Sequence, residues 1–319
     1  MMAGMAFADM THSTDGSGTT VTGYADIRLN IVDEAADDTP VAGKNENELK
    51  TKVWTEVDFE KKSGQTTVRI DLDFPVSDTA PQAEGISTSS QIEQAKFVWA
   101  SAGAVHGNGA GHGINFTGGA FNSPIGSEHQ DAPYRWFADR GQLASLLPAN
   151  IAGFMVSLTE SSSVINMPHT LDVFFGNEWV DNNAEDNTTG VLFGITPVRH
   201  VNLKAGYLTS EDSVVDATTD VVLSITPHVV LEYLTNETQD GWSITGHLPL
   251  PHQNCAVAAR YDSVEEDDSD DDASTSLTLS VSHEFGSNLT TRLEWRTHDS
   301  GESGDSSDDL LTLQFVAKL

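Results

Sequence analysis

The sequence lacks the features of several common classes of protein. No stretch approaches the roughly 18 consecutive apolar residues of a membrane-spanning helix, and only 38% of the residues are hydrophobic, which excludes a bundle of such helices. The chain has one cysteine, Cys255, so it has neither an internal disulfide nor the C-x-x-C pairs of metal and haem sites. Its histidines show no H-x-x-x-H or H-x-H spacing, and no metal or cofactor is predicted.

Basic residues are also scarce. Lys and Arg number 16 against 48 Asp and Glu, which gives a formal net charge of -32. This charge would repel phosphate groups, so nucleic acid is excluded as a partner. No G-x-S-x-G serine motif occurs, and the protein is not predicted to be an enzyme.

What the sequence does contain is alternation with a period of two residues. From 21 to 30, apolar residues such as Ile27 and Leu29 alternate with polar ones such as Arg28 and Asn30. Such alternation predicts strands with one apolar and one polar face. Strands are predicted at 21–30, 51–60, 67–74, 91–100, 112–120, 151–159, 170–178, 189–196, 200–208, 217–226, 228–235, 241–248, 253–262, 275–285, 288–297 and 309–319. The chain is therefore predicted to be all-β with about sixteen strands, an even number as in bacterial outer-membrane barrels.

The connections between the predicted strands alternate in length. Short turns at 196–200, 227–228 and 286–288 follow even-numbered strands, and long acidic loops at 33–49, 179–188, 209–216, 265–274 and 299–309 follow odd-numbered ones. Short periplasmic turns and long extracellular loops are typical of a transmembrane antiparallel up-and-down β-barrel. The alternative is a secreted soluble β-sandwich. The acidic loops lack the fixed spacing of a calcium loop, so only diffuse divalent cations are expected there.

In four predicted strands in the second half of the chain, the last outward-facing residues before the loop include an aromatic one. Tyr207, Tyr233, Tyr261 and Trp295 each precede an acidic loop. Aromatic rings prefer the headgroup level of a membrane, so these four residues predict an aromatic girdle. The outward-facing residues in the middle of the same strands are aliphatic, whereas a sandwich would place large aromatics there as well. These residues are Ala205, Leu231, Val257 and Leu293.

Charged residues concentrate on the opposite face of the predicted strands, which would face the lumen. The predicted pore-lining residues are Arg28, Lys52, Glu56, Asp58, Arg69, Asp71, Lys96, Lys204, Arg260, Asp262, Arg292, Glu294 and Arg296. Their mixed sign suits a water-filled passage. The alternative is that they pair as a structural lattice in a closed or plugged barrel.

The longest connection, 121–150, is too long for an idle surface loop. Its aromatic residues and low acidity favour order over disorder. Folded into the lumen, it would form a constriction loop in which Glu128, Asp131, Arg135 and Arg140 set size and charge preference. The alternative is a loop packed over the extracellular mouth.

The chain starts with M-M-A-G-M-A-F-A-D, in which Ala6-Phe7-Ala8 has the small-x-small form of a signal-peptidase site. Residues 1–8 are interpreted as the remnant of a cleaved signal peptide, and residues 9–319 as a single outer-membrane barrel domain. A plain disordered terminus is the alternative.

The stretch from Gly118 onward is similar to a known family. The segment 119–128, G-A-F-N-S-P-I-G-S-E, resembles the G-K-F-x-T/S-P-I/L-G-x-E segment of the OmpL-like beta-barrel porin family, and 176–179, 181–183, 260–262 and 292–296 match further. The resemblance spans about two-thirds of the chain and implies a bacterial outer-membrane porin. Two departures are Ala120, where the family has lysine, and Leu319, where barrels usually end in phenylalanine.

The sequence therefore predicts a porin in the outer membrane of a Gram-negative-type bacterium, passing small hydrophilic solutes or ions by passive diffusion. Its partners would be outer-membrane lipid, lipopolysaccharide and the solutes. A homotrimer is the candidate assembly, because trimers are common among sixteen-strand porins. The alternative is a non-conducting barrel that acts as a structural or surface-interaction scaffold.

Overall fold

The computed structural model describes residues 19–33, 47–77, 91–101, 104–105, 111–161, 168–180, 183–210, 217–225, 228–251, 254–266, 273–301 and 308–318. The predicted signal-peptide remnant at 1–8, Leu319 and most residues of four of the five predicted acidic loops lie outside the described residues. The fifth predicted loop, 179–188, is wrong, because residues 179–180 and 183–188 belong to two paired strands. The described elements are nearly all strands. They are β1 (Thr19–Asp33), β2 (Asn47–Ser63), β3 (Thr66–Ser77), β4 (Gln91–Ala100), β5 (Ala104–Val105), β6 (Gly111–Asn122), β7 (Asn150–Ser161), β8 (Pro168–Val180), β9 (Asn183–Val198), β10 (Val201–Ser210), β11 (Ala217–Ile225), β12 (Val229–Thr235), β13 (Gln239–Leu250), β14 (Cys255–Glu266), β15 (Ser274–Phe285), β16 (Leu289–Asp299) and β17 (Asp308–Lys318).

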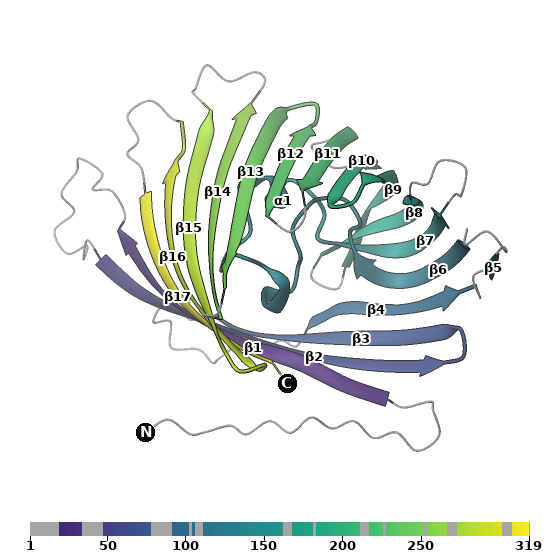
Figure 1. The fold of residues 1–319 in the computed structure, drawn as a ribbon, viewed down its shortest axis with the longest axis horizontal. Coiled ribbons are helices and arrows are strands. Elements are labelled where there is room, and N and C mark those ends of the chain that lie inside the picture. The colour runs from purple at the N-terminus through teal and green to yellow at the C-terminus, as the bar shows by residue number, and fades with distance from the viewer. Residues whose placement is uncertain are drawn as a thin grey trace.

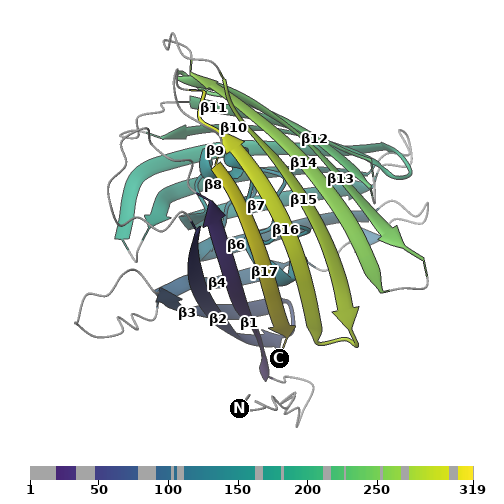
Figure 2. The same cartoon turned by 90° about the vertical axis from the view of Figure 1, so that its left-hand side faces the viewer.

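The strands form one closed ring. Neighbours in the chain pair antiparallel, and β17 pairs with β1, where Ile27 lies opposite Phe315 (Figure 1, Figure 2). β5 has only two residues and pairs with the start of β6, while β4 pairs directly with the rest of β6. The other sixteen strands make up the ring in the described part of the chain, which confirms the predicted antiparallel barrel and its strand number.

Alternate residues of each strand face the outside and the inside of the barrel. Outward positions carry large apolar side chains that remain exposed, such as Phe97 at 43%, Phe154 at 56% and Phe193 at 43%. Inward positions carry buried polar residues, among them Asp71 and Gln314 at 0%. A soluble sandwich would bury its apolar faces and expose its polar ones. The sandwich alternative is therefore wrong.

The strands extend further than the hydrophobic pattern indicates. β2 covers Asn47–Ser63 where 51–60 was predicted, and β9 covers Asn183–Val198 where 189–196 was predicted. Backbone hydrogen bonds between strands do not depend on the polarity of the side chains. Strand pairing therefore continues beyond the outward apolar residues. Polar pairs such as Lys62 opposite Thr67 lie on this extension.

The chain between β6 and β7 folds into the interior of the ring (Figure 1). This internal loop, residues 123–149, contains η1 (Ala132–Tyr134) and α1 (Gln142–Ser145), and α1 contacts β13 and β14. No helix in the described ranges is long and apolar enough to cross a membrane.

An apolar core forms where the internal loop meets the inner wall. The loop and its flanking strands contribute one side of this core, and β8, β10, β12 and β14 contribute the other. Its buried members are Phe121, Ile125, Leu143, Leu147, Ile151, Phe174, Leu208, Leu234 and Val264. Burial of these side chains stabilises the loop in its inward position.

Candidate functional site

The internal loop leaves and rejoins the barrel wall at one place. The backbone N–H of Ser123 donates to the carbonyl oxygen of Ala149 at 2.8 Å. Next along the loop, Ile125 packs against Gly206 of β10, where an added Cβ would lie 3.2 Å from the Ile125 side chain. The absence of a side chain at 206 therefore lets the loop approach the wall.

Carboxylates of the wall accept hydrogen bonds from the loop backbone. The N–H of Gly126 donates to Asp220 Oδ2 at 3.0 Å, and the N–H and Oγ of Ser127 donate to Glu232 at 3.0 and 2.6 Å. Backbone N–H groups inside a protein need such acceptors, because an unpaired one costs free energy. Asp220 and Glu232 thus fix the path of the loop.

Arg260 of β14 joins the loop to the wall through its guanidinium. Nη1 lies 2.7 Å from Glu128 Oε1 of the loop, and Nε lies 3.0 Å from Asp262 Oδ2 of the same strand. The guanidinium carbon lies 4.5 Å from the ring centroid of Phe137. Glu128 in turn accepts from the N–H of Gly141 at 3.1 and 3.0 Å. These charged groups are held by one another.

A second group of contacts holds the loop against β1, β16 and β17. Arg28 binds Asp26 at 2.6 Å and also pairs with Asp139 of the loop. Arg292 donates to Gln314 Oε1 and to the carbonyl oxygen of Arg135, both at 2.7 Å. Glu294 accepts from the N–H of Ala138 at 2.6 Å.

A third group lies on β2 and β3. Arg69 Nε lies 2.6 Å from Asp71 Oδ1, and its Nη2 lies 3.2 Å from Asp58 Oδ1 and 3.9 Å from Glu56 Oε1. On β4, Lys96 Nζ donates to Gln94 Oε1 at 2.5 Å. One arginine therefore faces three carboxylates here.

The structure divides the predicted pore-lining residues into two sets. Ten take part in the contacts just described, at positions 28, 56, 58, 69, 71, 96, 260, 262, 292 and 294. Lys52 is exposed, and Lys204 and Arg296 are half-buried. The predicted mixed-charge face and the predicted salt-bridge lattice thus describe the same side chains.

The four predicted constriction residues all belong to the internal loop, with different surroundings. Glu128 is held by Arg260, and Arg140 Nη2 donates to the carbonyl oxygen of Ala144 at 2.6 Å. Burial raises the pKa of Asp131, although the charge of Arg69 opposes the shift. Burial lowers the pKa of Arg135, and the neighbouring Arg28 lowers it further. Burial therefore disfavours the ionised form of both groups.

The predicted girdle residues lie on the outer surface. Tyr207 and Tyr233 are 46% and 45% exposed, whereas Tyr261 and Trp295 are half-buried. Trp242 of β13 is a further outward aromatic, 5.3 Å between ring centroids from Tyr261. The predicted girdle omits Trp242, because it includes only aromatic residues that directly precede an acidic loop.

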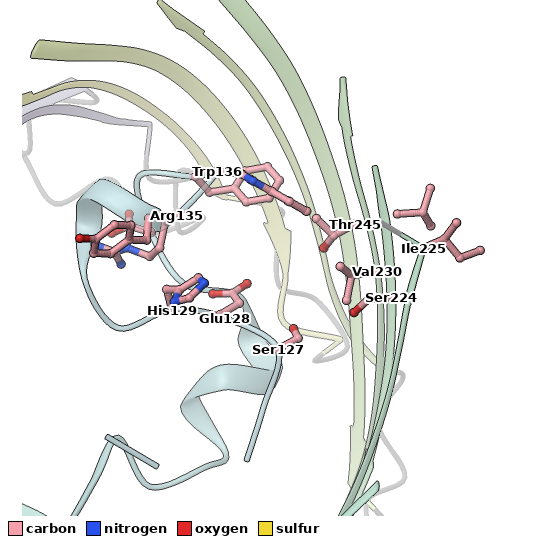
Figure 3. A pocket seen from close by; sticks show the side chains of 13 residues that line it. Ser127, Glu128, His129, Arg135, Trp136, Ser224, Ile225, Val230 and Thr245 are labelled. Carbon is pink, nitrogen blue, oxygen red and sulfur yellow. The ribbon is translucent and has the colours of Figure 1, made fainter. Parts of the chain in front are cut away.

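A cavity of about 260 Å³ lies between the internal loop and β11–β13 (Figure 3). Glu128, His129, Arg135 and Trp136 line it from the loop, and Ser224, Val230 and Thr245 line it from the wall (Figure 3). Trp136 stacks on His247 of β13 with ring centroids 4.7 Å apart, which fixes the loop beside the cavity.

A closed antiparallel ring of sixteen long strands with a long loop folded inside is the fold of bacterial porins. Solved structures with this fold match almost the whole chain. A loop-deletion mutant of OmpT, an outer membrane protein of Vibrio cholerae, matches with a TM-score of 0.60 at 14% identity, over 96% of this chain and 100% of that one.

Two further structures support the same assignment of fold. A mutant of the Rhodopseudomonas blastica porin matches with a TM-score of 0.55 at 12% identity, over 94% of this chain and 100% of that one. Salmonella typhi OmpF in complex with daunomycin matches with a TM-score of 0.63 at 9% identity, over 97% and 100%. No family model and no curated protein matches the chain, so the resemblance to the OmpL-like family stays a prediction.

Proposed function

We propose that the protein is an outer-membrane porin that lets small hydrophilic solutes or ions diffuse through a polar lumen of mixed charge. The observation that carries this proposal is an inner wall of charged side chains that holds a long loop inside the barrel. Polar walls and a narrowed passage are how pores select solutes by size and charge. The resemblance to the OmpL-like family and the porin fold support it.

In this proposal, the inward charged residues line the passage, and the internal loop with Glu128, Asp131, Arg135 and Arg140 forms its constriction. The cavity between loop and wall is where a solute would pass closest to His129 and Trp136. Outside, the apolar belt would contact outer-membrane lipid and lipopolysaccharide, with the four girdle residues at the headgroup level. Residues 1–8 would direct export, and the assembly would be a homotrimer.

Planar-bilayer recordings of the purified, folded protein test the proposal directly. We expect discrete conductance steps in molar salt. A folded barrel that inserts into the bilayer but gives no steps would contradict it, and heat-denatured protein serves as the blank.

The role of the loop in charge preference has its own test. Arg140→Glu reverses one charge on the loop and should shift the reversal potential towards cation preference. Lys62→Glu, the same change of charge at the exposed end of β2, should leave it nearly unchanged.

One observation favours the alternative scaffold function. The apolar core and the buried ion pairs lie inside the ring, where a wide pore would need open space. A scaffold would never conduct, and it would lose binding to a surface when its external loops are shortened.

A further inference from the structure

Three carboxylates from separate segments meet where the internal loop faces β2 and β4. They belong to Glu56, Glu93 and Asp131, and one oxygen of each lies within 4.8 Å of the others. Oxygen ligands lie about 2.3–2.6 Å from a calcium ion, so two ligands of one ion are at most roughly 5 Å apart. The spacing of the three oxygens fits a single ion.

Two of these carboxylates have a buried oxygen atom without a hydrogen-bond partner in the part of the chain that the structure describes. Glu56 is only 1% exposed, and its Oε2 has no hydrogen-bond partner among the described residues. The Oδ1 atom of Asp131 is buried and is likewise without one in the described part of the chain. A buried carboxylate oxygen left without a partner is costly, which indicates that these oxygens face a ligand.

The backbone of β4 is irregular at the third carboxylate. Asp71 lies opposite Gln94 and Leu72 lies opposite Ile92, so Glu93 is skipped in the pairing with β3. Such a β-bulge breaks the alternation of a strand and redirects a side chain, often at a functional site. Here the bulge allows the side chains of Gln94, which is 1% exposed, and the neighbouring Glu93 both to lie inside the barrel.

The nearby basic groups are already engaged. Arg69 binds Asp71 and Asp58 closely and reaches only Glu56 Oε1, at 3.9 Å. Lys96 donates to Gln94. No described ion pair joins an arginine or lysine side chain to Glu93 or Asp131, so negative charge is in excess where the three carboxylate oxygens converge.

We propose that Glu56, Glu93 and Asp131 bind one divalent cation, which ties the internal loop to the barrel wall. Calcium fits best, because it accepts carboxylate oxygens in flexible geometry, whereas magnesium keeps its water and demands a near-ideal octahedron. This cation site is separate from the proposed passage of solutes. The protein could bind the cation without conducting, or conduct without binding it, and the two tests are independent.

Equilibrium dialysis against calcium tests the site on the folded, detergent-solubilised protein after treatment with a chelator. Sodium chloride at about 0.3 M screens diffuse binding to the acidic surface. We expect one saturable calcium ion per chain. Its affinity should fall by at least about tenfold in Glu93→Gln and in Asp131→Asn, and it should be unchanged in Glu284→Gln, which alters an exposed carboxylate near the end of β15.

A stability measurement on the unmodified protein covers the case in which a variant does not fold. Calcium should raise the urea midpoint of the wild type, because a ligand that binds the folded state stabilises it. The two site variants should show no such rise. The proposal is overturned if calcium binding is equal in all proteins, if binding disappears in salt, or if calcium leaves the wild-type midpoint unchanged.

Discussion

Among single residues, Arg260 shows how the wall holds the internal loop. Its side chain is 1% exposed and contacts Glu128 of the loop and Asp262 of β14. In such a buried cluster the loss of one partner leaves the others uncompensated, which costs far more than the loss of a surface pair. The position of the loop therefore depends on a few buried charges.

Replacing Arg260 with methionine should lower the free energy of unfolding by about 3 kcal/mol, because Glu128 and Asp262 lose their cation. Urea denaturation followed by tryptophan fluorescence measures the loss. Arg199→Met, at an exposed turn, should cost under about 0.5 kcal/mol. Adding Glu128→Gln and Asp262→Asn to Arg260→Met should recover part of the loss, and no recovery would contradict this account.

Gly206 and Ile125 give a second prediction at this scale. Gly206→Val should destabilise the protein by about 1–3 kcal/mol, since its side chain would overlap Ile125 of the loop. Combining it with Ile125→Ala should cost less than the sum of the two changes. Gly246→Ala is the control, because the nearest atom to its added Cβ is 3.9 Å away. Additive costs in the double variant would show that the two residues do not share a contact.

At the scale of elements, alternation was enough to predict the strands and their number, because inward and outward faces repeat every two residues. Alternation could not predict the strand ends, or Glu93, which a bulge moves out of phase. It also could not pair Gly126 and Ser127 with Asp220 and Glu232, which lie 94 and 105 residues away in the sequence. Those contacts depend on how the ring closes.

The internal loop can be removed without opening the wall, because Ser123 and Ala149 are already hydrogen-bonded. Replacing residues 124–148 with a two-residue turn should give a folded barrel with higher single-channel conductance. The measurement is conductance beside the wild type in the same bilayer, with unheated electrophoretic mobility as the check on folding. An unchanged conductance from the folded variant would mean that the loop does not narrow the passage.

At the scale of the whole molecule, the outward apolar belt sets the depth at which the barrel would lie in a membrane. Leu293 and Thr297 share the outward face of β16 on either side of Trp295. Leu293→Lys should reduce folding stability in lipid vesicles by about 2–4 kcal/mol, and Thr297→Lys by at most about 1 kcal/mol. Equal costs at the two positions would contradict the proposed membrane placement.

The seam between β1 and β17 has a consequence for how the molecule is made. Gln314 donates to Asp26 at 2.8 Å across 288 residues of sequence. Contacts so distant in the chain form late, since a long loop must close before they stabilise anything. Until β17 arrives, β1 has an unpaired edge that other strands could join, which makes the incomplete chain prone to aggregation. A carrier that shields this edge before insertion would protect the protein at its most vulnerable stage.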